Sequence, residues 1–355
     1  MSVNKIVRNW LFVGLILVFV QVIIGGITRL TDSGLSITEW EVIAGTIPPT
    51  NAEDWQIAFD KYKVSAKKQY ESLHGDMTLS EFKFIYFWEW FHRLWARMMG
   101  FIFLFPFLYF LYKSWIPRWL LQRLGIVIAL AALAAVFGWI MVASGLNDDK
   151  RTWVSAYKLL THLMIATSLF SYLYWTWLKA GDSAQRSVVK HPLSKMSFWV
   201  CVIIFVQIGL GALMAGTRAG LIHPYFPLFV KLENLLASLN PKPGGVVENF
   251  INYEQGIFIK GIVQILHRLT AYGLSALIIV FYIKIKKTKQ PSLQVINTGM
   301  LVMLITQFVL GVLTVINCFG KVPLLYGVLH QAGALVLLAF ALAMYYKLRK
   351  IDKIT

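Results

Sequence analysis

Charged residues are scarce in this chain. Asp, Glu, Lys and Arg make up 14% of its 355 residues, whereas soluble domains carry about 25%. Hydrophobic residues reach 57%, and the mean hydropathy is +0.63. A soluble protein of this length has no core large enough for so much apolar surface, but a bilayer solvates it. The scarcity of charge therefore excludes a soluble globular protein and predicts a membrane protein.

Cysteine and acidic residues are also few. The two cysteines are Cys201 and Cys318, and Cys201 lies within an apolar run, which argues against a disulfide framework. The net charge is +17, because 34 basic residues stand against 17 acidic ones. The basic residues gather in short segments on one side of the apolar stretches, as in membrane proteins, so we expect no nucleic-acid partner. The first apolar run has no cleavage site after it, and we interpret it as a helix and not as a signal peptide.

Eight apolar stretches are long enough to cross a bilayer, which takes about 20 residues per helix. They lie at 10–29, 84–111, 124–145, 157–178, 197–216, 257–283, 295–317 and 324–346.

The segments on one side of these spans are short and basic. They hold half of the 34 lysine and arginine residues and only two acids, Asp182 and Asp352. They are the N-terminus, 112–123, 179–196, 284–290 and the C-terminal tail. Positively charged short segments remain on the cytoplasmic side. The sequence thus predicts a multi-pass protein of the inner (cytoplasmic) membrane with both termini cytoplasmic.

The two long outer loops, 30–83 and 217–256, each contain an amphipathic stretch, near 52–72 and near 226–239. Their apolar residues are Trp55, Phe59 and Tyr62 in the first and Leu228, Leu232, Leu235 and Leu239 in the second. Two interpretations stay open, namely helices that lie on the membrane surface and loop helices that pack on the protein.

The two halves of the chain repeat each other. The run QVIIGGITRLTDSGLSI resembles QIGLGALMAGTRAGLI, FHRLWAR resembles LHRLTAY, and THLMIATSLF resembles LHQAGALVLL. Each unit has four spans, so the halves share one orientation and are related by an axis along the membrane normal. The sequence predicts an all-α integral membrane protein of eight transmembrane helices. They form two pseudo-symmetric four-helix bundles as parallel repeats, one in residues 1–180 and one in residues 181–355.

Four histidines fall inside the predicted spans, one on each even-numbered span: His92, His162, His267 and His330. Ionisable groups within a bilayer are costly and usually functional. Each histidine lies about 9–16 Å below the outer end of its span, at the helical rise of 1.5 Å per residue. A single intramembrane histidine often only hydrogen-bonds a neighbouring helix. Four at matched depths and repeat positions indicate metal ligation instead.

Two imidazoles in each half suit the axial positions of a haem iron. Zinc is disfavoured, because no nearby cysteine or acid pair completes a tetrahedron. Small residues on the odd-numbered spans would let a flat ring approach; they are Gly25, Gly26, Gly138, Gly209, Gly211 and Gly311. We assign no function to the loop histidines His74, His191 and His223.

Haem propionates need cationic partners. Arg93 and Arg268 directly follow two of the histidines, and Arg29 and Arg218 end the first and fifth spans. We expect bidentate pairing between these arginines and the propionates. For Arg29 and Arg218, extension toward lipid headgroups is the alternative.

The two repeats carry different residues at the position of Glu89. It lies three residues before His92, on the same helix face, and the matching residue before His267 is Gln264. A carboxylate beside one haem and an amide beside the other indicates different tasks for the two halves. The alternative is that Glu89 only pairs with Arg93 one helical turn later.

The run TRLTDSGLSITEWEVIAGTIPP, together with EWFHRLWAR, LHRLTAY and LHQAGA, resembles haem A synthases, and the resemblance covers nearly the whole chain. It implies oxidation of the C8 methyl group of haem O to a formyl group, giving haem A for cytochrome oxidase. It also implies a resident haem b on His267 and His330, substrate haem O at His92 and His162, and a catalytic role for Glu89.

The chain lacks the cysteine pair that some haem A synthases carry in the first outer loop, and it resembles the mitochondrial and Gram-negative branch without that pair. Methyl-to-aldehyde oxidation removes four electrons, which two successive hydroxylations with loss of water would achieve. The protein supplies binding and orientation for such cofactor chemistry.

Two other functions remain as alternatives to a synthase. One is a bis-haem electron-transfer protein of the cytochrome b type, and the other is a transporter with histidine proton relays. The expected partners are the lipid bilayer, an unidentified electron donor, haem O synthase, the cytochrome oxidase assembly machinery, and further copies of the chain in a homo-oligomer.

Overall fold

The computed structural model describes residues 3–39, 44–146, 152–182, 188–189, 191–239, 248–288, 290–349 and 351–352. Eight long helices occupy the predicted positions. They are α1 (Lys5–Leu30), α4 (Leu79–Tyr112), α5 (Arg118–Ala143), α6 (Ala156–Ala180), α7 (Ser194–Thr217), α9 (Phe258–Lys286), α10 (Pro291–Ile316) and α11 (Leu324–Leu348). Their ends differ from the predicted spans by up to six residues, because span prediction follows hydropathy and the helices continue past the apolar stretch.

Seven of the long helices are long and apolar enough to cross a membrane, and α6 is not among them. The prediction of an all-α, multi-pass integral membrane protein is therefore confirmed. Membrane crossing by α6 remains a prediction. Its sequence is less apolar than that of the others, because Lys158, Thr161, His162 and several hydroxyl-bearing residues interrupt it.

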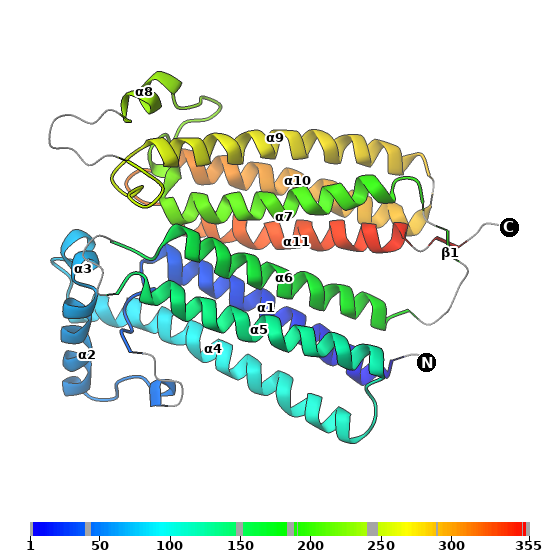
Figure 1. Cartoon of the computed structure of the whole chain (residues 1–355), viewed down its shortest axis with the longest axis horizontal. Coiled ribbons are helices and arrows are strands. Elements are labelled where there is room, and N and C mark those ends of the chain that lie inside the picture. Colours follow the sequence, from blue (N-terminus) through cyan, green and yellow to red (C-terminus); the bar gives the residue numbers. More distant parts are fainter. Residues whose placement is uncertain are drawn as a thin grey trace.

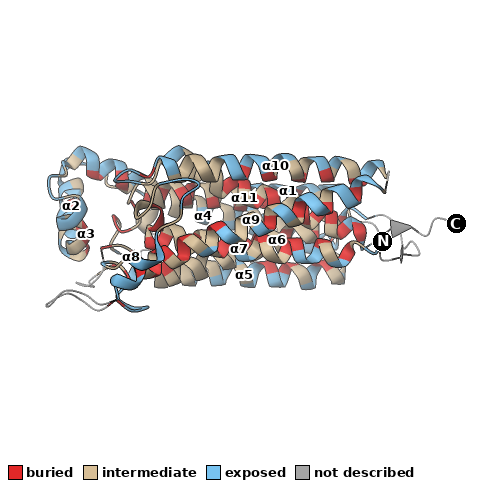
Figure 2. Cartoon of the chain, turned by 90° about the horizontal axis from the view of Figure 1, so that it is seen from above, coloured by how far each residue is buried: buried red, intermediate tan, exposed pale blue. Residues whose placement is uncertain are grey.

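The helices lie side by side along the long axis of the molecule (Figure 1). In that view α7, α9, α10 and α11 form one group and α1, α4, α5 and α6 form the other. The groups meet where α6 packs on α7 and where α1 packs on α11. The largest hydrophobic core fills this contact, with Leu11, Leu173, Ile204 and Met344 fully or almost fully buried. Figure 2 shows the buried residues concentrated along these inner helices.

The shorter elements lie at the ends of the bundle. Helices α2 (Ala52–Ser65), α3 (Lys67–Leu73) and α8 (Leu232–Ala237) lie at one end, and the start of α1 lies at the other (Figure 1). Two 3₁₀ turns, η1 (Ala44–Thr46) and η2 (Ala219–Leu221), belong to the outer loops. The strands β1 (Val188–Val189) and β2 (Ile351–Asp352) form one short antiparallel pair.

The two amphipathic loop stretches differ in how they pack. Phe59 and Tyr62 of α2 are buried against Phe82 at the start of α4, so this stretch packs on the protein. In and around α8, Leu235 is buried, whereas the neighbouring leucines are exposed. The first stretch therefore follows the second interpretation, because its aromatic side chains find a hydrophobic partner in α4.

Candidate functional site

His267 on α9 and His330 on α11 face each other inside the second half. Their ring centroids are 6.4 Å apart, with an angle of 76° between the ring planes. An imidazole nitrogen bonds a metal at about 2 Å and lies about 1 Å from its own ring centroid, so two axial imidazoles put their centroids about 6 Å apart. The separation of this pair fits a six-coordinate iron between the two rings.

Four glycines lie against the four histidines. A Cβ atom added at Gly25, Gly138 or Gly311 would lie 3.0–3.1 Å from the Cε1 atom of His92, His162 or His330, and at Gly211 it would lie 3.5 Å from that of His267. The odd-numbered spans therefore approach the histidines closely at these four glycines. Gly26 lies against Gln331, and Gly209 lies against Met164 and Leu160. That the glycines admit a flat ring stays a prediction.

Two glutamines hold the histidines of α4 and α9. The Nε2 atom of Gln21 donates to the carbonyl of His92 at 3.2 Å and lies 3.3 Å from its ring nitrogens. Gln207 makes the same contacts with His267, at 2.9 Å to the carbonyl. Sequence reasoning missed both residues, although the repeat aligns the QVIIGG and QIGLGA runs that contain them.

The remaining polar atoms also fit a haem in each half. The Nδ1 atoms of His162 and His330 are buried without a hydrogen-bond partner among the described residues. Within the same part of the chain, no cluster of three or more His, Cys, Asp or Glu side chains is arranged to hold a metal ion. Two histidines per half, with no third protein ligand, match an iron whose other four bonds come from a porphyrin and do not match tetrahedral zinc.

Glu89 is buried at the outer end of α4, with 2% of its surface exposed. Its Oε1 atom accepts a hydrogen bond from Arg93 at 2.6 Å, and its Oε2 atom accepts from the hydroxyl of Ser36 and from the backbone N–H of Ile37, both at 2.8 Å. The expected contact with Arg93 is present. The carboxylate also fixes the first outer loop, a contact that the sequence did not reveal.

The arginines that follow the histidines extend this arrangement. Arg93 donates to the carbonyls of Ile37 at 2.9 Å and Glu39 at 3.0 Å. In the second half Arg268 donates to the carbonyls of Tyr225 and Leu228, at 3.2 and 2.9 Å. In both halves the arginine thus ties the outer loop to the end of the helix that carries the histidine.

Gln264 replaces Glu89 at the matching position of the second half. It is fully buried and donates through Nε2 to the carbonyls of Ala219 and His223. The two positions share a loop-anchoring contact and differ in charge. The amide of Gln264 donates to loop carbonyls, whereas the carboxylate of Glu89 accepts from loop donors and pairs with Arg93.

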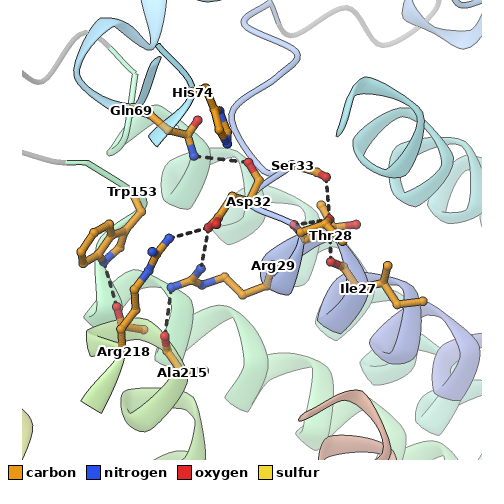
Figure 3. Close-up of polar contacts among 12 residues, drawn as sticks. Ile27, Thr28, Arg29, Asp32, Ser33, Gln69, His74, Trp153, Ala215 and Arg218 are labelled. Carbon is orange, nitrogen blue, oxygen red and sulfur yellow. Dashed lines mark hydrogen bonds and ion pairs between the residues drawn. The ribbon is translucent and has the colours of Figure 1, made fainter. Parts of the chain in front are cut away.

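Arg29 and Arg218 converge on Asp32 (Figure 3). Arg218 Nη2 lies 2.5 Å and Arg29 Nη1 lies 3.5 Å from the same carboxylate oxygen, and Arg29 also donates to the carbonyl of Ala215 at 2.9 Å. The Arg218 guanidinium stacks over Trp153, 4.2 Å from the ring centroid. These contacts cross between the two halves. The sequence did not identify Asp32, although it stands in the TRLTD run.

Two residues of this cluster have a left-handed backbone conformation. Asp32 and Arg218 both have φ of 55°, in the left-handed region, just after α1 and α7. Such a conformation costs about 1–3 kcal/mol for a residue other than glycine and persists where the surroundings require it. The matched turns direct the two side chains toward each other.

A polar network links Asp32 to the helices above it. Gln69 of α3 donates to the backbone carbonyl of Asp32 at 3.3 Å, and Tyr62 of α2 contacts both Gln69 and the Nδ1 atom of His74, at 3.2 and 2.6 Å. Burial raises the pKa of Tyr62 and lowers the pKa of His74. His74 is thus favoured in its neutral form, and its Nδ1 atom shares a hydrogen bond with the hydroxyl oxygen of Tyr62.

The sequence of the whole chain matches known proteins. The profile of the COX15-CtaA family, described as cytochrome oxidase assembly protein, matches residues 8–342. A Flavobacterium johnsoniae protein described as heme A synthase is 38% identical over 99% of both chains. Proteins with the same description from Nitrosospira multiformis and a Caulobacter species are 37% and 38% identical, over 98% of this chain and 95% and 97% of their own.

The family match covers more than nine tenths of the chain, and the relatives align with it from end to end. It spans both histidine pairs, Glu89 and the arginine cluster around Asp32. The chain therefore belongs to the COX15-CtaA family of cytochrome oxidase assembly proteins.

Proposed function

We propose that this protein is a haem A synthase that oxidises the C8 methyl group of haem O to a formyl group. The observation that carries the proposal is a facing pair of intramembrane histidines, His267 and His330, in a chain whose relatives are described as heme A synthases. The second histidine pair, His92 and His162, lies against matched glycines in the other half. One pair per half gives a site for a substrate haem and a site for a resident haem.

We also propose eight membrane spans in two pseudo-symmetric halves, residues 1–180 and 181–355. Helix α6 has 25 residues, about 37 Å at the helical rise, which exceeds a hydrocarbon core of about 30 Å. It packs along α5, α1 and α7. The matched contacts of Gln21 with His92 and of Gln207 with His267 support the symmetry. The basic segments favour cytoplasmic termini in an inner membrane.

In the proposed assignment, haem b resides on His267 and His330, and haem O binds between His92 and His162. A bound haem supplies iron redox chemistry and a route for electrons. The chain's own residues position the rings, since Gln21 and Gln207 fix two of the four histidines. Arg93 and Arg268 stand at the outer ends of the two sites, where cations favour the propionates.

Glu89 is the residue that we propose to act in the reaction. Its carboxylate stands beside Arg93 one turn from His92, where a fixed negative charge stabilises a cationic centre at the methyl carbon or orients water. Conversion of the methyl to a formyl group is a four-electron oxidation, which two hydroxylations followed by loss of water would achieve with an oxidant and an oxygen source supplied from outside the chain. The neutral Gln264 in the second half accords with a haem there that is not transformed.

Co-expression with a haem O synthase tests the proposal. Haems extracted from the membranes are separated by chromatography and identified by mass. Haem A formation that depends on this chain is the expected result. Haem b in the purified protein with haem O left unchanged would favour the bis-haem electron carrier, and absence of haem would favour the transporter.

A further inference from the structure

Side chains along α4 and α5 are less buried than those along α9 and α10, the matching helices of the second half. No side chain is buried between residues 90 and 109 of α4 or between 128 and 143 of α5, all of which the structure describes. The matching stretch of α9 contains buried Arg268, Leu274, Ile278 and Phe281, and that of α10 contains buried Leu304 and Gln307. The two halves therefore differ in how far these matching helix pairs are buried.

An aromatic contact closes the second half. Tyr272 of α9 and Phe308 of α10 have ring centroids 6.1 Å apart. Counted from the histidine on α4 or α9 and from the glycine on α5 or α10, their counterparts are Arg97 and Ala135. Ala135 is exposed. A methyl group thus replaces a phenyl ring at the matching position of the first half.

The second outer loop adds to this closure. Phe229 contacts Tyr272 and Phe226 contacts Phe308, with ring centroids 6.3 and 6.1 Å apart. Arg268 stacks over both loop rings, at 4.6 Å from Phe229 and 5.7 Å from Phe226. Four aromatic rings therefore cover the gap between α9 and α10 close to His267.

A cavity of about 180 Å³ lies between α4 and α5. It is lined by Arg93 of α4, by Trp139, Val142 and Ala143 of α5, by Leu146 after α5, and by residues 37–39 of the first outer loop. Trp139 is 48% exposed, so a lipid-facing aromatic side chain forms one wall of this cavity. The cavity reaches the loop that Glu89 anchors.

We propose that the face between α4 and α5 is a lateral portal through which a haem with a long isoprenoid tail enters His92 and His162 directly from the bilayer. The inference rests on the proposed function and adds the route of the substrate. Haem O is an amphiphile with a long apolar chain, so it partitions into the membrane and not into water. A portal of this kind suits the half that exchanges its haem, and the aromatic closure suits the half that retains it.

The test uses the full chain in lipid nanodiscs that contain haem O as the probe. Ala135→Phe introduces the ring that Phe308 supplies in the second half. Ala129→Phe is the matched control, because Ala129 is also exposed on α5 but lies about 120° around the helix from Ala135. Stopped-flow absorbance in the Soret region follows haem O binding and its release to acceptor vesicles, and a pyridine haemochrome spectrum reports haem b content.

We expect Ala135→Phe to slow both binding and release of haem O at least tenfold, with unchanged affinity and haem b content, and Ala129→Phe to match the wild type. Wild-type rates for Ala135→Phe would overturn the portal. A weakened affinity with unchanged rates would also overturn it, because the new ring would then fill the site and not its entrance. Failure of the wild type to bind haem O at all would contradict the proposed function itself.

Phe308→Ala tests the closed half independently. Removal of this ring opens the contact with Tyr272, and we expect haem b to pass to apomyoglobin at least several times faster than from the wild type. A Phe308→Leu variant, which keeps apolar bulk, should lie between the two. Equal haem b release from all three proteins would contradict the proposed difference between the halves.

Discussion

At the scale of single residues, a substitution at Glu89 distinguishes a catalytic role of this residue from a role in loop anchoring. Glu89→Gln keeps the shape of the side chain and removes the charge, as in Gln264 of the second half. We expect the variant to insert, retain haem b and bind haem O, yet to form haem A on the order of 100-fold more slowly, because fixed charge is strongest in a dry site. Mass detection of extracted haems should show haem O or a partly oxidised alcohol.

Ser36→Ala provides the matched control for Glu89. It removes one hydrogen bond to the Glu89 carboxylate and leaves the charge in place. If loop anchoring were the whole role of Glu89, the two variants would lose activity to a similar extent. A small loss in Ser36→Ala beside a large loss in Glu89→Gln indicates that the carboxylate charge itself is needed.

The two cysteines give a prediction of no effect. Cys201 is buried in α7, and Cys318 is buried after α10, where its Sγ atom donates to the carbonyl of Thr314 at 3.1 Å. Burial raises the pKa of Cys318 to about 11, so its unreactive thiol form prevails. The double change Cys201→Ser, Cys318→Ser should keep most haem A formation in membranes with normal protein levels. Loss of activity would reveal a thiol function.

At the scale of secondary structure, α2 and α3 contain a titratable contact. Burial holds the pKa of His74 below its ordinary value of 6.5. Between the lowered pKa of the folded state and the ordinary pKa of 6.5, the unfolded segment therefore binds more protons than the folded one. The stability from this contact is present above about pH 6.5 and is lost as the pH falls through the lowered pKa. Protection factors of the amides in residues 52–73, corrected for the intrinsic pH dependence of exchange, should fall between pH 7.5 and 5.5. In His74→Gln this fall should be smaller, and an unchanged fall would assign it to other groups.

The helices were predictable from the sequence because hydropathy reports membrane spans directly. The even-numbered spans also revealed His92, His162, His267 and His330, since ionisable residues stand out against an apolar run. Their pairing within each half was predicted from matched depths and repeat positions, whereas the glutamine contacts were not predictable, because these contacts depend on helix rotation. Helix α6 is more polar than the other long helices, so its membrane crossing stays a prediction.

Contacts between distant segments were the least predictable part of the site. Arg29 and Arg218 stand out in the sequence as cations at the ends of spans, but the sequence does not show that both contact Asp32. The loop that Glu89 anchors was also hidden, because Ser36 and Ile37 lie 53 and 52 residues earlier in the chain. Tertiary folding alone brings these groups together.

At the scale of the whole molecule, the cluster around Asp32 joins the two halves. Asp32→Ala leaves Arg29 and Arg218 close together without the carboxylate between them. We expect the free energy of unfolding to fall by about 1.5–3 kcal/mol, the range for a hydrogen bond to a charged group. The exposed Asp60, which pairs with Lys63 on α2, supplies a control. Thermal unfolding in detergent should show a lower Tm for Asp32→Ala than for Asp60→Ala, and equal values would contradict a joining role.

The measurement that tests the two-site account most directly compares His267→Ala with His92→Ala. Each variant is co-expressed with a haem O synthase, and the purified protein is analysed for haem b, haem O and haem A. The account predicts that His267→Ala loses haem b, whereas His92→Ala retains haem b and forms no haem A. A full low-spin haem b spectrum in His267→Ala, or loss of haem b from His92→Ala, would contradict the assignment of the resident haem to the second half.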